Sequence, residues 1–392
     1  MASTCAAPIA GVCRVARVSG PAEVAVAALC DLLGEGPERV PPAMVLYFCA
    51  GWYPPRRVVP LICERFPDSL VVGCSTPGQF TGEEIGCDGI SAIALPHDVV
   101  GACAAAVTGI RPDVQGDADQ AVEELETQLG FRLASLDRRR YVLLALGDAG
   151  RDPEDRVDSH LRRFAPRLRL VVGSVGDDLA FQGEWVAVGA SVRRHGMALI
   201  VMEPRVGFHE LRAAGFTGRG RPLRIGKADT GARVVHTLND RPAVNVYAET
   251  LAMSIAEVDA ATLLKHPLGL RRDGESWVCS PLAVTADGGL LFSSPLAVGT
   301  WVQVMDQVQV QDQANAIRAA RSAVGGAVSG AVIIDCILAG WENARPDRQV
   351  LTAVDGVAAA GFYTYGDTWR GHPNRGLEGL LFGSVSRSSH QR

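Results

Sequence analysis

The sequence predicts a mixed α/β protein built from duplicated βαβ-turn-β units, with a further α/β domain at the C-terminus. Two short runs carry this prediction, LVVGCS at residues 70–75 and LVVGSV at residues 170–175. An apolar, β-branched run that breaks on glycine is typical of a buried strand entering a tight turn. The likeness continues downstream, where FTGE at residues 80–83 is matched by FQGE at residues 181–184. We expect units at residues 44–107 and 141–214, forming packed or continuous mixed sheets with outer helices.

The first elements follow from local patterns. Residues 1–42 form an N-terminal extension with a predicted helix at residues 22–33, which ends at Gly34. Each unit then opens with an apolar strand, at residues 44–49 and 141–146, followed by a proline-containing helix start. Residues 90–95 and 99–107 close the first unit as predicted strands. The helix of the second unit is predicted at residues 154–164.

The clearest helix signal lies between the two units, at residues 117–129. Apolar side chains recur there on one helical face, Asp117 can cap the start, and Gly130 can end the helix. Further along, the pattern predicts a strand at residues 234–238, a turn at residues 239–242 and a helix at residues 243–253.

A shift in composition near residues 255–275 marks the predicted boundary between an N-terminal domain, residues 43–255, and a C-terminal domain, residues 256–385. Residues 386–392 are a tail. The C-terminal domain has a hairpin signal at residues 284–292, because Asp287-Gly288 supplies the positive φ angles of a tight turn. A strand at 301–310, a helix at 313–324 and strands at 331–337, 357–366 and 377–382 follow. This order is similar to a third copy of the opening unit.

Composition excludes some classes of function. The net charge of -5 over 392 residues leaves no broad basic field, which disfavours nucleic-acid binding. The 10 cysteines form no C-x-x-C pair and the 8 histidines no H-E-x-x-H pattern, so no metal site is predicted. Scattered cysteines within apolar runs indicate a reducing cytoplasm. We expect no secretory signal, because no basic residue precedes Arg14, and no membrane span, because the weakly charged run at residues 323–341 is interrupted by glycines and Asp335.

The turn at residues 173–178 is the first candidate site. Gly173, Ser174 and Gly176 supply permissive backbone and a hydroxyl, and Asp177 and Asp178 supply adjacent carboxylates. Backbone amides there can point at a ligand, and the carboxylates can bind an ammonium group or orient a hydroxyl. The alternative is that both carboxylates simply cap the turn through backbone amides.

The matching turn adds Cys74 and Ser75 as candidate ligand-binding residues, and it also permits a second interpretation. A cysteine held exposed and deprotonated after a strand-end glycine can act as a nucleophile. No histidine stands in a recognisable nucleophile pattern with Cys74, so this turn is expected to be chiefly structural.

The C-terminal strand end is richer in polar groups. Tyrosines two positions apart on an extended segment point to the same face, and nearby side chains add donors and acceptors for a small polar ligand. Packing of aromatic rings at a sheet edge is the alternative. The candidate residues are Tyr363, Tyr365, Gly366, Asp367, His372 and Asn374.

These motifs resemble the FIST family, a sensory module with an N-terminal and a C-terminal part. The resemblance rests on VVGCSTPGQF (71–80), VVGSVGDDLAF (171–181), NDRPAVNVY (239–247), HPLG (266–269), the Asp335-Cys336 strand end, and GFYTYGD (361–367) with the HPN that follows. Four features depart from the family pattern: a double glycine is reduced to Gly173-Ser174, a Gly-Glu is Gly366-Asp367, an arginine usual after the Asp335-Cys336 strand is not where expected, and an Asn-Gln-Thr ending is Asn374-Arg375-Gly376. The identity of the ligand is therefore not carried over.

The resemblance implies a cytoplasmic protein that binds a small molecule, such as an amino acid or a similar polar metabolite, and signals through a separate protein. A haem-bound nitric oxide sensor is the first alternative, because haem is reported for some family members. An enzyme that uses Cys74 or the Asp177-Asp178 pair is the second. Neither nucleic acid nor membrane is an expected partner.

Overall fold

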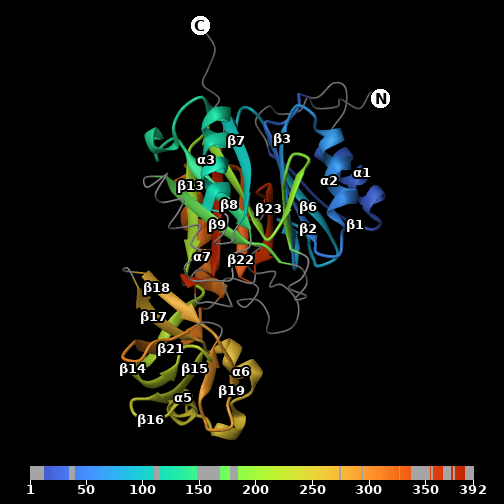
Figure 1. Cartoon of the computed structure of the whole chain (residues 1–392). Coiled ribbons are helices and arrows are strands. Elements are labelled where there is room, and N and C mark those ends of the chain that lie inside the picture. Colours follow the sequence, from blue (N-terminus) through green and yellow to red (C-terminus); the bar gives the residue numbers. More distant parts are fainter. Residues whose placement is uncertain are drawn as a thin grey trace.

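The structure is a computed structural model that describes residues 13–34, 40–109, 115–147, 168–176, 184–272, 275–292, 295–308, 310–325, 327–336, 354, 356–364, 372–373 and 376–384. It has a larger unit of three mixed sheets and a smaller unit of one sheet, which lies below the larger unit in Figure 1. The predicted mixed α/β class is confirmed. The sheets are packed against one another rather than continuous.

Three sheets form the larger unit. In spatial order, the strands of the first sheet are β1 (Arg14–Ser19), β6 (Gly89–Leu95), β2 (Met44–Ala50), β3 (Leu70–Thr76), β10 (Trp185–Val188) and β11 (Ser191–Arg194). Those of the second are β7 (Val100–Gly109), β12 (Gly196–Pro204), β8 (Val142–Gly147) and β9 (Arg169–Ser174). Those of the third are β13 (Phe208–Ala213), β25 (Leu377–Gly383), β22 (Val328–Cys336), β23 (Ala359–Thr364), β4 (Gln79–Thr81) and β5 (Ile85–Gly86).

The same strand order recurs in all three sheets. In β1-β6-β2-β3, β7-β12-β8-β9 and β13-β25-β22-β23, the third strand pairs in parallel with the fourth and antiparallel with the second. A parallel pair needs a crossover connection. In the first sheet the crossover is α2 (Pro55–Arg65), which begins at a proline as expected. The helix predicted at residues 154–164 lies outside the described residues.

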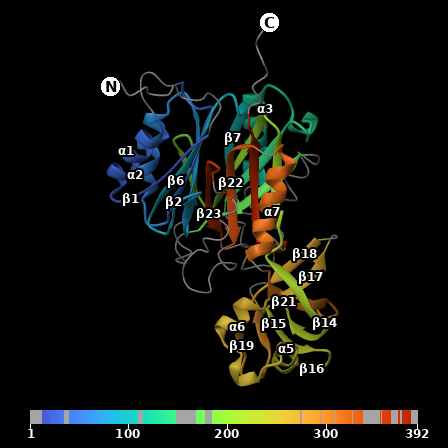
Figure 2. The ribbon, with the colours of Figure 1, turned by 180° about the vertical axis from the view of Figure 1, so that it is seen from behind.

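One apolar core lies between the three sheets, and helices cover their outer faces. Leu46, Leu144 and Ile334, one from each sheet, belong to this shared core. Outside, α1 (Ala22–Leu33) and α2 pack on the first sheet, α3 (Gln115–Leu129) on the second and α7 (Val310–Ala323) on the third. Figure 2 shows α7 beside β22 and the helices α1 and α2 at the opposite side.

The Phe362 ring joins the three sheets within this core. Its centroid lies 4.9 Å from that of Phe48 in the first sheet. On the other side is Gly173 of the second sheet, where an added Cβ atom would lie 2.6 Å from Phe362 Cζ. The glycine therefore makes room for the ring, because real Cβ atoms essentially never approach so closely.

Both early helix predictions are confirmed, with one correction. α1 ends at Gly34, whose φ of 91° is the left-handed conformation that favours glycine. α3 begins at Gln115 instead of after Asp117, so the predicted capping role of Asp117 is wrong. The Asp117 carboxylate instead lies 3.7 Å from the Arg193 guanidinium on β11. A short 3-10 helix, η2 (Leu133–Ser135), follows α3.

The smaller unit has its own sheet and its own core. The strand order is β19 (Pro281–Val284), β20 (Leu290–Phe292), β15 (Val234–Leu238), β14 (Phe216–Asp229), β21 (Trp301–Gln307), β17 (Leu268–Arg272), β18 (Glu275–Cys279) and β24 (His372–Pro373), with β16 (Arg241–Pro242) beside β15. Three helices join it: α5 (Ala243–Leu251), η3 (Ile255–Glu257) and α6 (Ala260–Lys265). Its core includes Ile225, Tyr247 and Phe292. The compositional shift near residue 255 falls inside this unit.

Several predictions for the smaller unit are confirmed. β15 and α5 start where the sequence pattern places them, and β19 pairs antiparallel with β20 across the predicted hairpin. Gly288 in its turn has a φ of 79°. The long β14 was not predicted, because only Phe216, Leu223 and Ile225 of its residues are buried and no regular alternation results.

Candidate functional site

The ends of three strands from three different sheets meet at one place. The Gly176 N–H, just after β9, donates to the Ser75 carbonyl oxygen of β3 at 3.2 Å. The Tyr363 N–H of β23 donates to the Gly78 carbonyl oxygen at 2.8 Å. The residues at the end of β3 and just after it therefore contact the carboxyl ends of both other strands. Ligands bind most often at such strand ends in α/β proteins.

Strand exchange between the sheets fixes this meeting point. After β3 the chain enters β4, which pairs with β23 of the third sheet. After β9 it leads to β10, which pairs with β3 of the first sheet. The segment after β23 leads instead to β24, which pairs with β18 of the smaller unit. The strands β4, β10 and β24 therefore each belong to a different sheet from the strand numbered just before them, which is β3, β9 and β23 respectively.

The candidate turn after β9 is described only as far as Gly176. Gly173 faces the shared core beneath Phe362, and Ser174 ends the strand half-buried. Asp177 and Asp178 lie outside the described residues, as do Tyr365, Gly366, Asp367 and Asn374. The backbone of His372 pairs with Val278 in the smaller unit. The joint site of these side chains stays a prediction.

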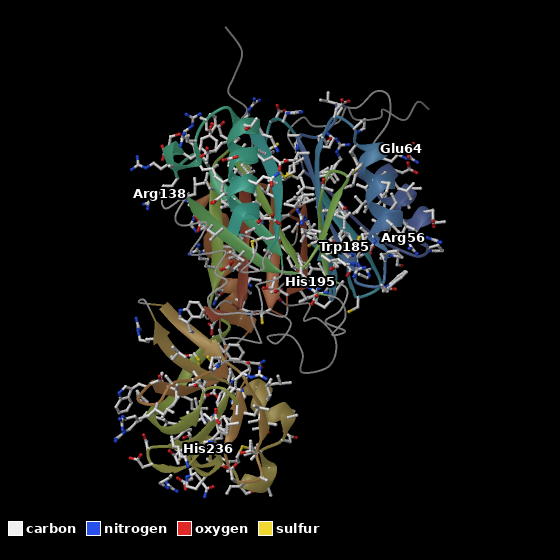
Figure 3. The ribbon with its side chains drawn as sticks, viewed as in Figure 1. Arg56, Glu64, Arg138, Trp185, His195 and His236 are labelled. Carbon is white, nitrogen blue, oxygen red and sulfur yellow. The ribbon has the colours of Figure 1, made fainter. Side chains whose placement is uncertain are left out.

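The geometry of Cys74 opposes a nucleophilic role. Its side chain is buried among apolar residues of the shared core, and this burial raises the pKa of the thiol. A nucleophile needs the opposite shift and an exposed sulfur. Ser75 is structural too, because its Oγ accepts a 2.9 Å hydrogen bond from the Trp185 N–H and so fastens β10. Figure 3 labels Trp185 within the larger unit.

Tyr363 is also largely committed to packing. Its ring centroid lies 5.1 Å from that of Phe80 in a buried cluster on the outer face of the third sheet. The backbone of Tyr363, through its bond to Gly78, is the part that meets the other strand ends. This favours the ring-packing alternative for this tyrosine.

A charged cluster that the site prediction omitted lies in the smaller unit. The His266 Nδ1 atom is 2.8 Å from the Asp306 Oδ1 atom and 3.3 Å from the Met305 carbonyl oxygen. The Arg219 Nη1 group donates to both carboxylate oxygens of Asp306, at 3.0 and 3.2 Å. The HPLG motif could have indicated His266 as a site residue. No recognised motif contains Arg219 or Asp306, which lie on strands β14 and β21.

This His266–Asp306–Arg219 cluster lies where the two units join. β21 ends just after Asp306, and the chain then enters α7 of the larger unit. The Val308 N–H donates to the Gly215 carbonyl oxygen at this crossing. On the side of the larger unit, the Gly376 N–H donates to Ala213 and the Cys336 N–H donates to Gly376, at the carboxyl end of β22.

The described histidines do not fit the axial position of a haem site. A haem requires a histidine or another axial ligand that faces an apolar pocket. Among the histidines whose side chains the structure describes, none is buried, and His266 stands beside the charged Asp306 and Arg219. Within the same residues, no group of three or more His, Cys, Asp or Glu side chains is placed to hold a metal ion.

Two family models match this chain. The FIST N domain matches residues 43–241, and the FIST C domain matches residues 243–370. Together they cover most of the sequence, so the chain belongs to the FIST family. FIST domains are generally associated with sensory signal transduction. The search of curated proteins gave no match.

Proposed function

We propose that this protein is a sensor that binds a small polar ligand, such as an amino acid, where the strand ends of the larger unit meet the smaller unit. One observation carries the proposal: hydrogen bonds from the Gly176 and Tyr363 amides join the ends of β9 and β23 to residues 75–78, at the end of β3 and just after it. Ligands of α/β proteins bind most often where strand ends meet in this way. The sensory association of the family agrees with this role.

Each side of the junction offers different chemistry to such a ligand. In the smaller unit, Asp306 holds the Nδ1 side of His266, so Nε2 is the nitrogen left for a ligand, on a side chain that is 20% exposed. In the larger unit, Asp177 and Asp178 suit an ammonium group, which leaves a carboxylate of the ligand to the His266 Nε2 atom. An amino acid carries both of these groups.

We further propose that the protein acts in the cytoplasm and passes its signal to a separate protein. No disulfide joins the described cysteines, which agrees with a reducing compartment. Of the described helices, none combines the length and the apolar character needed to cross a membrane.

A thermal-shift screen of amino acids and related metabolites tests the ligand proposal. We expect at least one compound to raise the melting temperature of the wild type, because a ligand that binds only the folded state stabilises it. The shift should fall in His266→Gln and in Asp178→Ala.

His236→Gln is the matched control for His266→Gln. His236 also has its Nδ1 atom 2.8 Å from an aspartate, Asp287, but it lies in the part of the smaller unit away from the junction (Figure 3). The His236 variant should keep the full ligand shift. Equal shifts in both histidine variants, or no shift with any compound in the wild type, would contradict the proposal.

A further inference from the structure

Gln79 is a fully buried carboxamide whose hydrogen-bonding groups are unused. Its side chain is 0% exposed, and neither Nε2 nor Oε1 has a hydrogen-bond partner in the part of the chain that the structure describes. An amide that is buried and unbonded carries the full free-energy cost of losing its hydrogen bonds to water. Such a group in a folded protein requires an explanation.

The position of Gln79 suggests that explanation. It begins β4, directly after the residues that bond to the ends of β9 and β23. In the antiparallel pairing of β4 with β23, Gln79 stands opposite Phe362, so the two side chains share one face. Phe362 belongs to the shared core, whereas the neighbouring Phe80 belongs to the outer cluster. The carboxamide therefore turns inward, at the end of the core nearest the meeting strand ends.

A second glutamine, the exposed Gln128 of α3, has both ends of its side-chain amide bonded within the same fold. The Gln128 Oε1 atom accepts from the Ala105 N–H at 3.1 Å, and its Nε2 donates to the Ala105 carbonyl oxygen at 2.9 Å. Both polar ends of the Gln128 amide are bonded to one residue of β7. Gln79 has the same pair of groups, at the end of the core nearest the meeting strand ends and without such a residue.

We propose that the Gln79 carboxamide recognises the ligand through a paired donor and acceptor. The ligand class is then a small molecule with a primary amide, or with a similar adjacent N–H and carbonyl, that can bond both ends of the side chain at once. This inference rests on the proposed function and specifies its ligand. A neutral amide edge of this kind satisfies both Gln79 groups, whereas a group that only accepts satisfies one.

Thermal shift with defined probes tests this recognition on the full chain. The amide probes are propionamide and L-glutamine, and the matched probes without an amide N–H are butanone and L-methionine. The proteins are wild type, Gln79→Leu, Gln79→Glu and the control Gln128→Leu. We expect the amide probes to stabilise the wild type and Gln128→Leu alike. Their affinity for Gln79→Leu and for Gln79→Glu should be lower by at least about tenfold.

Melting without any probe gives a second, independent result. Gln79→Leu should melt at or above the wild type, because it removes an unbonded buried amide, whereas Gln128→Leu should melt lower after losing its bonds to Ala105. If Gln79→Leu fails to fold, the inference is overturned, because the amide must then be bonded inside the protein.

Three further results would overturn the inference. They are equal stabilisation of wild type and Gln79→Leu by the amide probes, no stabilisation of the wild type by either amide probe, and a markedly lower melting temperature for Gln79→Leu without probe. If other compounds stabilise the wild type while amides do not, the proposed sensor function stands and the amide recognition falls. If no compound does, both fall.

Discussion

The strands β3 and β9 carry the same four letters, LVVG, yet they turn opposite faces to the core. In β3, Val72 and Cys74 belong to the shared core, and Gly73 lies on the outer face under the ring of Tyr47. An added Cβ atom at Gly73 would meet three atoms of that ring. The parallel pairing of Tyr47 with Gly73 confirms that both face outward.

In β9 the pattern is displaced by one position. Val171 belongs to the shared core, and Gly173 faces that core next to Phe362 and Ile334. Gly173 pairs with Leu146, another core residue. Since a strand alternates its side chains, a slip of one residue exchanges the two faces. Gly173 therefore corresponds in space to Cys74, and the matching letters do not mark equivalent positions.

The largest effect is expected for Gly73→Ala. The new methyl group collides with the Tyr47 ring, which is fully buried and cannot withdraw, so we expect a loss of about 3 kcal/mol in the free energy of unfolding. Urea unfolding measures it. Combining the change with Tyr47→Leu should recover part of the loss, and combining it with Phe362→Leu should not. If Gly73→Ala were coupled to Phe362→Leu instead, Gly73 would face the shared core and its assignment to the outer face would be wrong.

Gly173→Ala should cost less, about 2 kcal/mol, because the added Cβ atom would lie 2.6 Å from the Phe362 ring and 2.8 Å from the Ile334 Cδ1 atom, a smaller overlap than the 2.1 Å approach to Tyr47 at Gly73. A double-mutant cycle with Phe362→Leu should show coupling. The same cycle with Tyr47→Leu should be additive. Additivity with Phe362→Leu would mean that Gly173 does not face the core.

The serines after these positions sharpen the comparison further. Ser75→Ala should lower the free energy of unfolding by about 1 kcal/mol, because the Trp185 N–H loses its acceptor, while ligand response is retained. Ser174→Ala should cost less stability and reduce the ligand-induced thermal shift. Urea unfolding and thermal shift on the same two proteins check both expectations. The opposite outcome would place the ligand at the β3 turn.

The smallest effect concerns the thiols. Burial raises the pKa of Cys74, so at pH 8 the thiol stays protonated and unreactive. Cys87 is exposed. Iodoacetamide labelling followed by mass spectrometry should modify Cys87 in the native protein and Cys74 only after unfolding. Labelling of Cys74 at the rate of Cys87 would restore the cysteine-enzyme alternative.

Local patterns predicted the elements that depend on neighbours in the chain. The α1 helix has an apolar face and a glycine stop, and β15 is followed by Asn239 and Asp240, which adopt the positive φ angles of the expected turn. Such signals act over a few residues, so a single sequence contains them.

The short exchanging strands could not be predicted in the same way. β4 spans Gln79–Thr81 and β10 spans Trp185–Val188, and each pairs with a strand that is distant in sequence. Their burial is fixed by those distant partners and not by local alternation. For the same reason, the sequence does not indicate that Gly173 faces the core. Nor does it indicate that His266 lies close to Asp306, because this proximity follows from the pairing of β17 with β21.

Amide hydrogen exchange with and without the most stabilising compound of the screen tests the proposed ligand site most directly. We predict that the ligand slows exchange at Gly176, Tyr363 and the residues of the turn between β3 and β4, because these amides surround the meeting strand ends. Exchange around His236 should be unchanged. Protection confined to the smaller unit near His236, or no compound that gives protection at the strand ends, would contradict a ligand site at this junction.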